Sequence, residues 1–417
     1  MANRYWVGGT AAWDGTAGTK WALTSGGAGG QAIPTSADDV FFDAASGANT
    51  VTISTGNTGA KSIACTGFTG TLAGSANITV AGSVTLVSGM TFTYSGIFTL
   101  TATGTFTSGS KTPTGILVNG TGITVSLGDA FTTVSGGSII LSAGTFNLNG
   151  FTATASSFSS NGATTRAVTF GTSNIVLASP IAAAVILNMA IANSFTYTGT
   201  GGFTRNMAAT ATVEFGSTSG GTTSNAPNLT VSAGASALTI TSGSYFKNLV
   251  FTGSTSTVTA SSVNMAGNLT LATGGTYTAV APTFLTTGTL TSSGKTLSSL
   301  TVNGSGITVT CADALTTSGA LTHTLGTLKL KDGVTSTVGS FVTTGTTLKY
   351  LESASAGTQA TISDTTGTNT LTYLSVKDSI ATGGAVFDAR SATNVDAGNN
   401  NGWIFVSGGG NFISFFM

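Results

Sequence analysis

Residues 105–133 read TFTSGSKTPTGILVNGTGITVSLGDAFTT, and residues 289–317 read TLTSSGKTLSSLTVNGSGITVTCADALTT. The second stretch repeats the pattern of the first at an offset of 184 positions, which places Asp129 with Asp313. Both stretches alternate apolar residues with Thr or Ser between turns that contain Gly and Asn, as expected of short strands with one buried face. The chain therefore contains an internal duplication of a β-rich segment.

The similarity extends beyond these stretches in both directions. It defines two arms of about 105 residues, 61–166 and 247–349, in which residues 151–166 match residues 334–349. The residues between the arms, 167–246, resemble further strands of the same kind without a clear copy. We expect matched lysines at solvent-facing corners, where a charge discourages edge-to-edge association: Lys61 with Lys247, and Lys111 with Lys295.

The composition of the 417 residues favours strands and excludes several classes of protein. The chain contains 83 Thr and 59 Gly but only 6% charged residues, against about 25% in ordinary soluble domains. The 40% of hydrophobic residues argues against disorder. The 13 Lys and Arg are too scattered to form the basic patch of a nucleic-acid-binding protein. Thr, Val and Gly favour extended structure over long helices.

A repeat of this kind predicts a stack in which each unit buries its apolar face against the next. We therefore expect an all-β protein, a β-solenoid similar to a parallel β-helix with a cap at each end. The alternative is a string of β-sandwich domains, because the repeat length is close to twice that of an immunoglobulin-like domain of about 100 residues. The four Trp residues lie near the chain ends, which does not suit a sandwich core.

The predicted organisation has six segments. They are an N-terminal cap and attachment region (1–60), a first β-repeat arm (61–166), connecting β-repeats (167–246), a second arm (247–349), C-terminal turns with a cap (350–405), and a flexible hinge with an apolar tail (406–417). A solenoid needs caps to cover its open strand edges. We assign that role to Trp6, Trp13, Trp21 and Trp403.

The two ends carry distinctive motifs. Residues 5–9 read YWVGG, residues 34–43 read PTSADDVFFD, and residues 396–405 read DAGNNNGWIF. With the Thr/Gly-rich body between them, they resemble a group of uncharacterised phage virion-associated β-helical repeat proteins. Related openings are found at the start of large bacterial β-helical surface proteins. The resemblance implies a fibre-like or adhesin-like role in a virion, and it brings no catalytic residue with it.

Localisation and partners follow as expectations. The first residues, MANRYW, contain no apolar segment typical of a secretory signal. The longest apolar run, 181–192, is shorter than the roughly 20 residues of a membrane span, so we expect a buried strand pair or a short covering helix there and no membrane insertion. We expect a virion protein that assembles in the host cytoplasm and leaves by lysis. Its partners would be other virion proteins and a host surface glycan or receptor, and we favour a homotrimer.

A search for catalytic residues favours structural roles. A depolymerising tailspike would need two carboxylates in one groove, and Asp129 with Glu214 is one candidate pair. Asp129 and Asp313, however, follow Gly or Ala in matched turns, where a carboxylate commonly accepts hydrogen bonds from backbone N–H groups. We therefore predict no enzyme activity, no catalytic residue and no cofactor.

Two oxygen-rich clusters are candidate metal sites. Asp38, Asp39 and Asp43 precede or follow the apolar residues 40–42, and we expect them to hold a turn rather than Ca²⁺. Asp396 with Asn399, Asn400 and Asn401 lacks the spacing of a calcium loop. A tight turn that brings Trp403 onto the last coil explains this cluster, so we predict no metal.

The remaining candidates are a single histidine and two cysteines. His323 matches a Ser or Ala in the other arm, and we expect it at a solvent-facing strand position. Cys65 and Cys311 are isolated, as is typical of small buried apolar residues.

The end of the chain differs from the body. After a Gly-rich hinge, residues 411–417 read NFISFFM, and we predict that Phe412, Ile413, Phe415, Phe416 and Met417 dock on a partner chain or a neighbouring copy. The alternative is that they fold back over the last coil. The sequence as a whole predicts a non-enzymatic structural or adhesive phage protein, such as a tail or head fibre or a capsid decoration. The alternatives are a polysaccharide-depolymerising tailspike and a bacterial surface adhesin.

Overall fold

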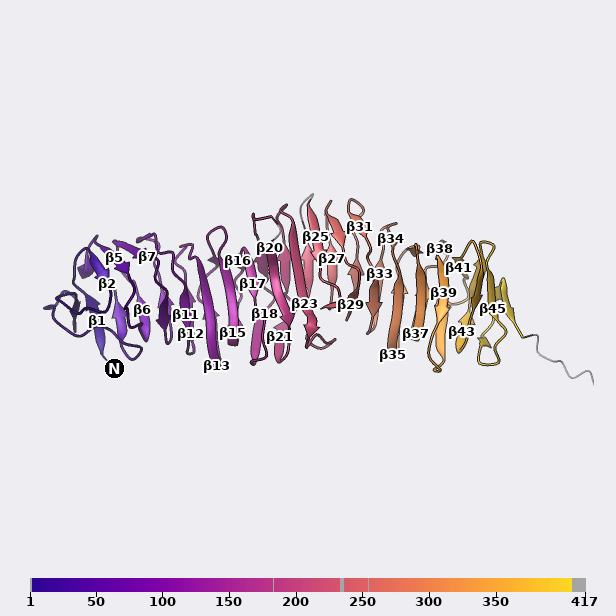
Figure 1. Ribbon diagram of the computed structural model, residues 1–417, viewed down its shortest axis with the longest axis horizontal. Coiled ribbons are helices and arrows are strands. Elements are labelled where there is room, and N and C mark those ends of the chain that lie inside the picture. Colours follow the sequence, from indigo (N-terminus) through magenta and orange to yellow (C-terminus); the bar gives the residue numbers. More distant parts are fainter. Residues whose placement is uncertain (1, 183, 233–235, 254, 407–417) are drawn as a thin grey trace, which may run out of the picture. The chain divides into compact units, whose positions relative to one another are not determined.

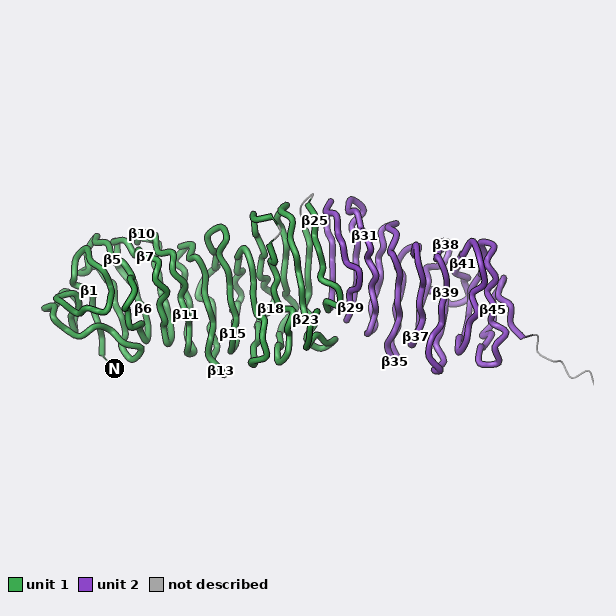
Figure 2. Tube along the Cα trace, viewed as in Figure 1, with its two compact units in different colours: residues 1–245 green, residues 246–417 purple. Residues whose placement is uncertain are grey.

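The computed structural model describes residues 2–182, 184–232, 236–253 and 255–406. The chain forms two compact units, residues 1–245 and 246–417 (Figure 2). In each unit short strands lie side by side in successive turns (Figure 1), and neighbouring turns pair in parallel. Each unit is thus a β-solenoid, which confirms the predicted fold class. Tandem sandwiches, whose sheets are antiparallel, are the wrong description of both units.

Unit 1 winds through three faces. The first face holds β1 (Asn3–Trp6), β4 (Asp39–Phe41), β6 (Ser62–Ala64), β9 (Val84–Thr85), β12 (Gly104–Thr107), β18 (Arg166–Gly171) and β21 (Phe195–Gly199). The second holds β8 (Ile78–Val80), β11 (Phe98–Leu100), β17 (Ser157–Ser159), β20 (Ala184–Ile191), β23 (Ala211–Ser219) and β25 (Ala237–Ile240). The long strands β13 (Gly115–Leu127) and β15 (Ser138–Asn147) run through both faces.

The third face of unit 1 is made of two sheets. One holds β2 (Ala11–Trp13), β5 (Thr50–Ile53), β7 (Thr71–Gly74) and β10 (Thr91–Phe92). The other holds β14 (Phe131–Thr132), β16 (Ala153–Ala155), β19 (Ile175–Leu177), β22 (Phe203–Arg205) and β24 (Leu229–Val231). β3 (Trp21–Ala22) is antiparallel to β1, and the described residues contain one helix, the short 3-10 helix η1 (Ala44–Ser46). Within the apolar run 181–192, Ala184–Ile191 form β20, a single strand rather than the expected strand pair or covering helix.

Unit 2 has three faces as well. One holds β27 (Leu249–Phe251), β30 (Leu269–Thr270), β33 (Gly288–Thr291), β40 (Lys349–Ser353), β43 (Leu374–Lys377) and β46 (Val395–Asp396). Another holds β29 (Val263–Met265), β32 (Pro282–Phe284), β39 (Ser340–Thr343), β42 (Thr368–Thr370), β45 (Val386–Ala389) and β48 (Trp403–Phe405). The long strands β35 (Leu300–Cys311) and β37 (Ala320–Leu330) run through both.

The third face of unit 2 completes each turn. It holds β28 (Thr257–Thr259), β31 (Thr276–Thr278), β34 (Thr296–Leu297), β36 (Thr316–Thr317), β38 (Thr335–Thr337), β41 (Ala360–Ser363), β44 (Ser379–Thr382) and β47 (Asn400–Asn401). The remaining strand, β26 (Ser244–Phe246), crosses the boundary between the units.

Apolar columns fill the inside of each unit. In unit 1, Ile78, Phe98, Ile116, Ile139 and Phe158 face one another through five successive turns, and each is at most 1% exposed. The residues that follow them point outward, because successive side chains of a strand point to opposite faces; they are Thr79, Thr99, Leu117, Ile140 and Ser159. Burial of each large side chain contributes about 1.5–3 kcal/mol. The repeated pattern therefore builds a continuous core within the unit.

The two copies of the duplicated sequence have matching structures. β13 and β15 of unit 1 correspond to β35 and β37 of unit 2, and each long strand bends where it passes from one face to the next. The bends include Gly144 and Gly326, both at positive φ (89° and 94°). A Cβ atom on Gly144 would lie 2.5 Å from the Gly120 oxygen, and one on Gly326 would lie 2.7 Å from the Gly304 oxygen. Glycine is therefore needed at both bends.

Candidate functional site

The predicted capping residues Trp6, Trp13 and Trp21 form one aromatic cluster at the N-terminal end of unit 1. All three are fully buried. Trp21 meets Trp6 and Trp13 edge to face, with ring centroids 5.0 and 5.3 Å apart, and Phe42 contacts all three rings. Edge-to-face pairs contribute about 0.5–1.5 kcal/mol beyond the burial of their area. The cluster covers the first turn of the core.

The acidic residues near this cluster hold turns. Asp38 accepts hydrogen bonds from the backbone N–H groups of Ala2 and Thr35, and Asp39 pairs with Lys61 at 3.0 Å. Asp43 caps η1 by accepting hydrogen bonds from the N–H groups of the first turn. In the described part of the chain, no three His, Cys, Asp or Glu side chains come together as metal ligands.

Polar residues and Trp403 lie at the last turn of unit 2. Asp396 lies in register with Val376 in an inward column, and its Oδ1 accepts hydrogen bonds from Asn400 Nδ2 (2.6 Å) and the Gly398 N–H (3.0 Å). Trp403 packs edge to face on Phe387, with centroids 5.1 Å apart. The Asp396–Asn401 cluster is thus a turn that ends the apolar column beside Trp403.

The matched aspartates perform the same task in both copies. Asp129 accepts hydrogen bonds from the N–H groups of Ser108 and Gly109, both at 2.7 Å. Asp313 accepts them from Ser292 and Ser293 at 2.9 and 2.5 Å. Each carboxylate therefore links its turn to the turn before it, as the matched turn contexts predict.

The other carboxylates also have partners within the fold. Glu214, the candidate companion of Asp129, has its Oε2 3.5 Å from Thr241 Oγ1, and no hydrogen bond joins it to Asp129. Besides Asp39 with Lys61, four more carboxylates form ion pairs: Asp14 with Lys20, Asp332 with Lys331, Glu352 with Lys329 and Asp388 with Arg390. Asn369 donates a hydrogen bond to Asp364, and Asn399 donates one to Asp378. Twelve of the 13 carboxylates thus have ion pairs or hydrogen bonds within the fold, and Glu214 has only the long contact with Thr241.

His323 is buried, so the expected solvent-facing position is wrong. Its side chain is 0% exposed, and it follows Val302 in an inward column of unit 2. The corresponding residue in unit 1 is Leu141, which follows Val118, and not the predicted Ser or Ala. His323 Nε2 lies 3.1 Å from the Gly326 oxygen, while Nδ1 has no hydrogen-bond partner among the described residues. Burial and the nearby Lys349 lower the pKa of His323 to about 4.

Three cations are also buried. Arg166 and Lys349 are 0% exposed and Arg205 is 1% exposed. The Arg166 guanidinium donates hydrogen bonds to the backbone oxygens of Ser160, Gly162, Thr164 and Asn193. The sequence comparison matched Arg166 with Lys349 but did not predict burial of either, because long cationic side chains are usually exposed.

The cysteines are buried as predicted. Cys65 and Cys311 are 0% and 1% exposed, and both are free thiols. Burial raises the pKa of each to about 12. A thiol with such a pKa is a poor nucleophile, so neither Cys is a candidate for covalent chemistry.

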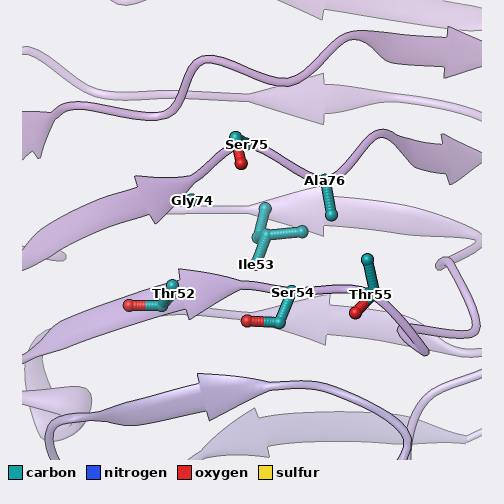
Figure 3. Close-up of a pocket in the computed structure, with 7 residues that line it drawn as sticks. All are labelled: Thr52, Ile53, Ser54, Thr55, Gly74, Ser75 and Ala76. Atoms are coloured by element: carbon teal, nitrogen blue, oxygen red, sulfur yellow. The ribbon is translucent and has the colours of Figure 1, made fainter.

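A hydroxyl-lined groove in unit 1, here called the cap-side groove, is the candidate binding surface. It has a volume of about 360 Å³ and is lined by Thr52, Ile53, Ser54, Thr55, Gly74, Ser75 and Ala76. Figure 3 shows Thr52, Ile53, Ser54 and Thr55 on one turn and Gly74, Ser75 and Ala76 on the neighbouring turn. Ile53 is buried. The side chains that offer polar groups at this surface are the hydroxyls of Thr52, Ser54, Thr55 and Ser75.

A second groove follows the third face of unit 1 and is more apolar. Its volume is about 290 Å³, and Val134, Pro180 and Met207 line it together with Thr132 and Thr154. A hollow of about 340 Å³ that shares Thr132 adjoins it and includes Lys111. Lys111 is half-buried, and its Nζ donates a hydrogen bond to the Ser88 oxygen at 2.8 Å. Both grooves carry little charge.

The predicted docking residues Phe412, Ile413, Phe415, Phe416 and Met417 lie outside the described residues. Among the described residues, no helix has the length and apolar character needed to cross a membrane. Comparison of the chain with protein-family models, curated proteins and solved structures gave no match.

Proposed function

We propose that this chain is a non-enzymatic structural and adhesive protein of a phage particle, a fibre or a surface decoration that contacts the host. The observation that carries the proposal is the use of its few charged groups. Twelve of the 13 carboxylates are held by ion pairs or hydrogen bonds within the fold, such as the Asp129 and Asp313 turn links, and Glu214 has only a long contact. A glycosidase needs two carboxylates that are free to act on one bond, and these have other partners. The terminal motifs, which resemble those of phage virion proteins, support the location.

The cap-side groove supports the adhesive part of the proposal. Its Thr and Ser hydroxyls both donate and accept hydrogen bonds, as a neutral glycan requires. The chain has a formal net charge of zero, so it has no long-range attraction for an anionic ligand such as nucleic acid. The ligand proposed for this surface is therefore a neutral host-surface glycan.

The location is tested by labelling intact phage particles with an antibody raised against the chain and imaging them by electron microscopy. Label on a tail fibre, a head fibre or the capsid surface supports the proposal. Particles that lack the chain in both imaging and mass spectrometry contradict it.

Binding is tested on a glycan array with the full chain and with T52V/T55V, which removes two hydroxyls but keeps the side-chain shape. T335V/T337V in unit 2 is the matched control, since both residues are exposed. If T52V/T55V loses at least tenfold in glycan affinity and T335V/T337V does not, the result supports the cap-side groove as the binding site. Release of oligosaccharides from a bound polysaccharide would instead show a depolymerising tailspike.

A further inference from the structure

The C-terminal end of unit 2 has an uncovered apolar edge. β48 pairs with β45 on one side, and it is the last strand of its sheet among the described residues. Ile404 and Val406 are 43% and 59% exposed. Trp403 is 9% exposed, whereas Trp6, Trp13 and Trp21 at the other capped end are fully buried. The polar closure by Asp396 and Asn400 therefore covers only part of the last turn.

A groove lies at this edge. It has a volume of about 260 Å³, and its lining includes Ala389, Ala392, Phe405 and Val406 as apolar residues and Asn394 and Asp396 as polar ones. Val406 is also the last residue that the structure describes. The chain thus leaves the described fold from the wall of the groove itself.

The sequence that follows is suited to this groove. Residues 411–417, NFISFFM, hold three Phe, one Ile and one Met and no charged side chain. Only residues 407–410, SGGG, separate them from Val406. Asn411 is five positions beyond Val406, a span of at most about 18 Å, so the heptapeptide is within reach of its own last turn. A short tether gives an effective concentration in the millimolar range, which favours binding within the chain over binding between chains.

We propose that residues 411–417 occupy the groove beside β48 of their own chain and complete the C-terminal cap. The unpaired edge of β48 offers backbone groups to such a peptide, and Trp403, Phe405 and Val406 offer it apolar surface. An extended peptide that adds to an exposed strand edge is a common mode of recognition. The same contact blocks an edge at which other chains could pair.

Trp403 provides the measurement, because the other three Trp residues are fully buried. Acrylamide quenching of tryptophan fluorescence is compared for the full chain, a chain ending at Val406, and F412S/F415S/F416S. W403F in each background isolates the Trp403 signal, and circular dichroism checks the fold. We expect at least a twofold rise in the Trp403 quenching constant for the truncated chain and the triple variant, and protection of the full chain that is independent of protein concentration.

Two outcomes overturn the proposal. Equal Trp403 quenching in the three chains would mean that the tail does not cover this end. Protection that is lost on dilution, together with a larger species in sedimentation, would mean that the tail binds a second copy. Restored protection on addition of the synthetic heptapeptide NFISFFM to the truncated chain would support the groove as its site.

Discussion

Arg166 and Lys349 begin corresponding strands, β18 and β40, in the two copies of the repeat, and both side chains are fully buried. Each binds backbone oxygens of the following turn. Arg166 reaches Asn193 at 2.6 Å, and Lys349 Nζ lies 3.2 Å from the Tyr373 oxygen and 5.8 Å from the centroid of its ring. Each buried cation thus links its turn to the next by hydrogen bonds to backbone oxygens, with no carboxylate among the described residues as a partner.

Replacing Arg166 should destabilise unit 1. R166M keeps most of the apolar stem but leaves several buried oxygens without donors, and each such group costs about 1–3 kcal/mol. We expect a loss of about 3 kcal/mol in the free energy of unfolding, measured by chemical denaturation. R166K, which copies the residue of unit 2, should lose less, and the control R390M alters an exposed side chain. Equal stability of R166M and R390M would contradict the role of the buried guanidinium.

Stability should fall in acid because of His323. The pKa of His323 is about 4 in the fold, below its ordinary value of 6.5. The unfolded chain therefore binds more protons between these values, and the unfolding free energy decreases as the pH falls from about 6.5 to 4. The loss is about 3 kcal/mol, since one pKa unit corresponds to 1.36 kcal/mol. H323L, which copies Leu141, should remove this part of the pH dependence in denaturation at pH 7, 5.5 and 4.

The reciprocal change tests the same explanation. L141H places an imidazole in the corresponding column of unit 1 and should add acid sensitivity over the same pH range. If the pH profile of H323L matches that of the unmodified chain, the buried imidazole is not responsible.

Removing the Asp129 carboxylate should weaken a turn. D129A leaves the N–H groups of Ser108 and Gly109 without their acceptor, at a cost of about 2–3 kcal/mol. E214A should change stability by less than about 0.5 kcal/mol, because Glu214 makes only a long contact. Thermal unfolding of the two variants distinguishes the structural carboxylate from its former candidate partner. Similar melting temperatures for both would refute the turn role.

Glycine should be essential at position 402 but not at 398. Both residues have positive φ (77° and 95°). A Cβ atom on Gly402 would lie 2.0 Å from the Ala381 oxygen, whereas one on Gly398 would meet no atom within 4 Å. G402A should therefore cost several kcal/mol and expose Trp403, while G398A costs only about 1–2 kcal/mol of backbone strain. Acrylamide quenching with denaturation compares them, and equal effects would exclude the close approach as the cause.

The fold could be predicted because its signal is repeated many times. The duplication, the period-two alternation and the shortage of helix formers all indicate the same architecture. His323 shows what was missed: in Leu321-Thr322-His323, the alternation places His323 on the same side as Leu321, and this parity indicated burial. Residue type alone suggested the opposite.

The buried cations and the cap-side groove were harder to predict. The copy alignment pairs Arg166 with Lys349, but their partners are backbone oxygens, which any residue type supplies. The groove depends on how the segments around Thr52 and Ser75 lie in adjacent turns. That placement requires the pairing register of β5 and β7, which the sequence pattern does not specify.

The coil length changes within unit 1. Residues in contact on neighbouring turns are 20 and 22 positions apart at Asn77 and Ser83, but 29 and 28 positions apart at Tyr197 and Asn174. A strictly periodic stack can slide by one whole repeat during folding and still match most of its contacts. Here such a slip would align coils of unequal circumference and leave unmatched loops. The unequal lengths of the turns therefore favour a single register of pairing between neighbouring turns of the unit.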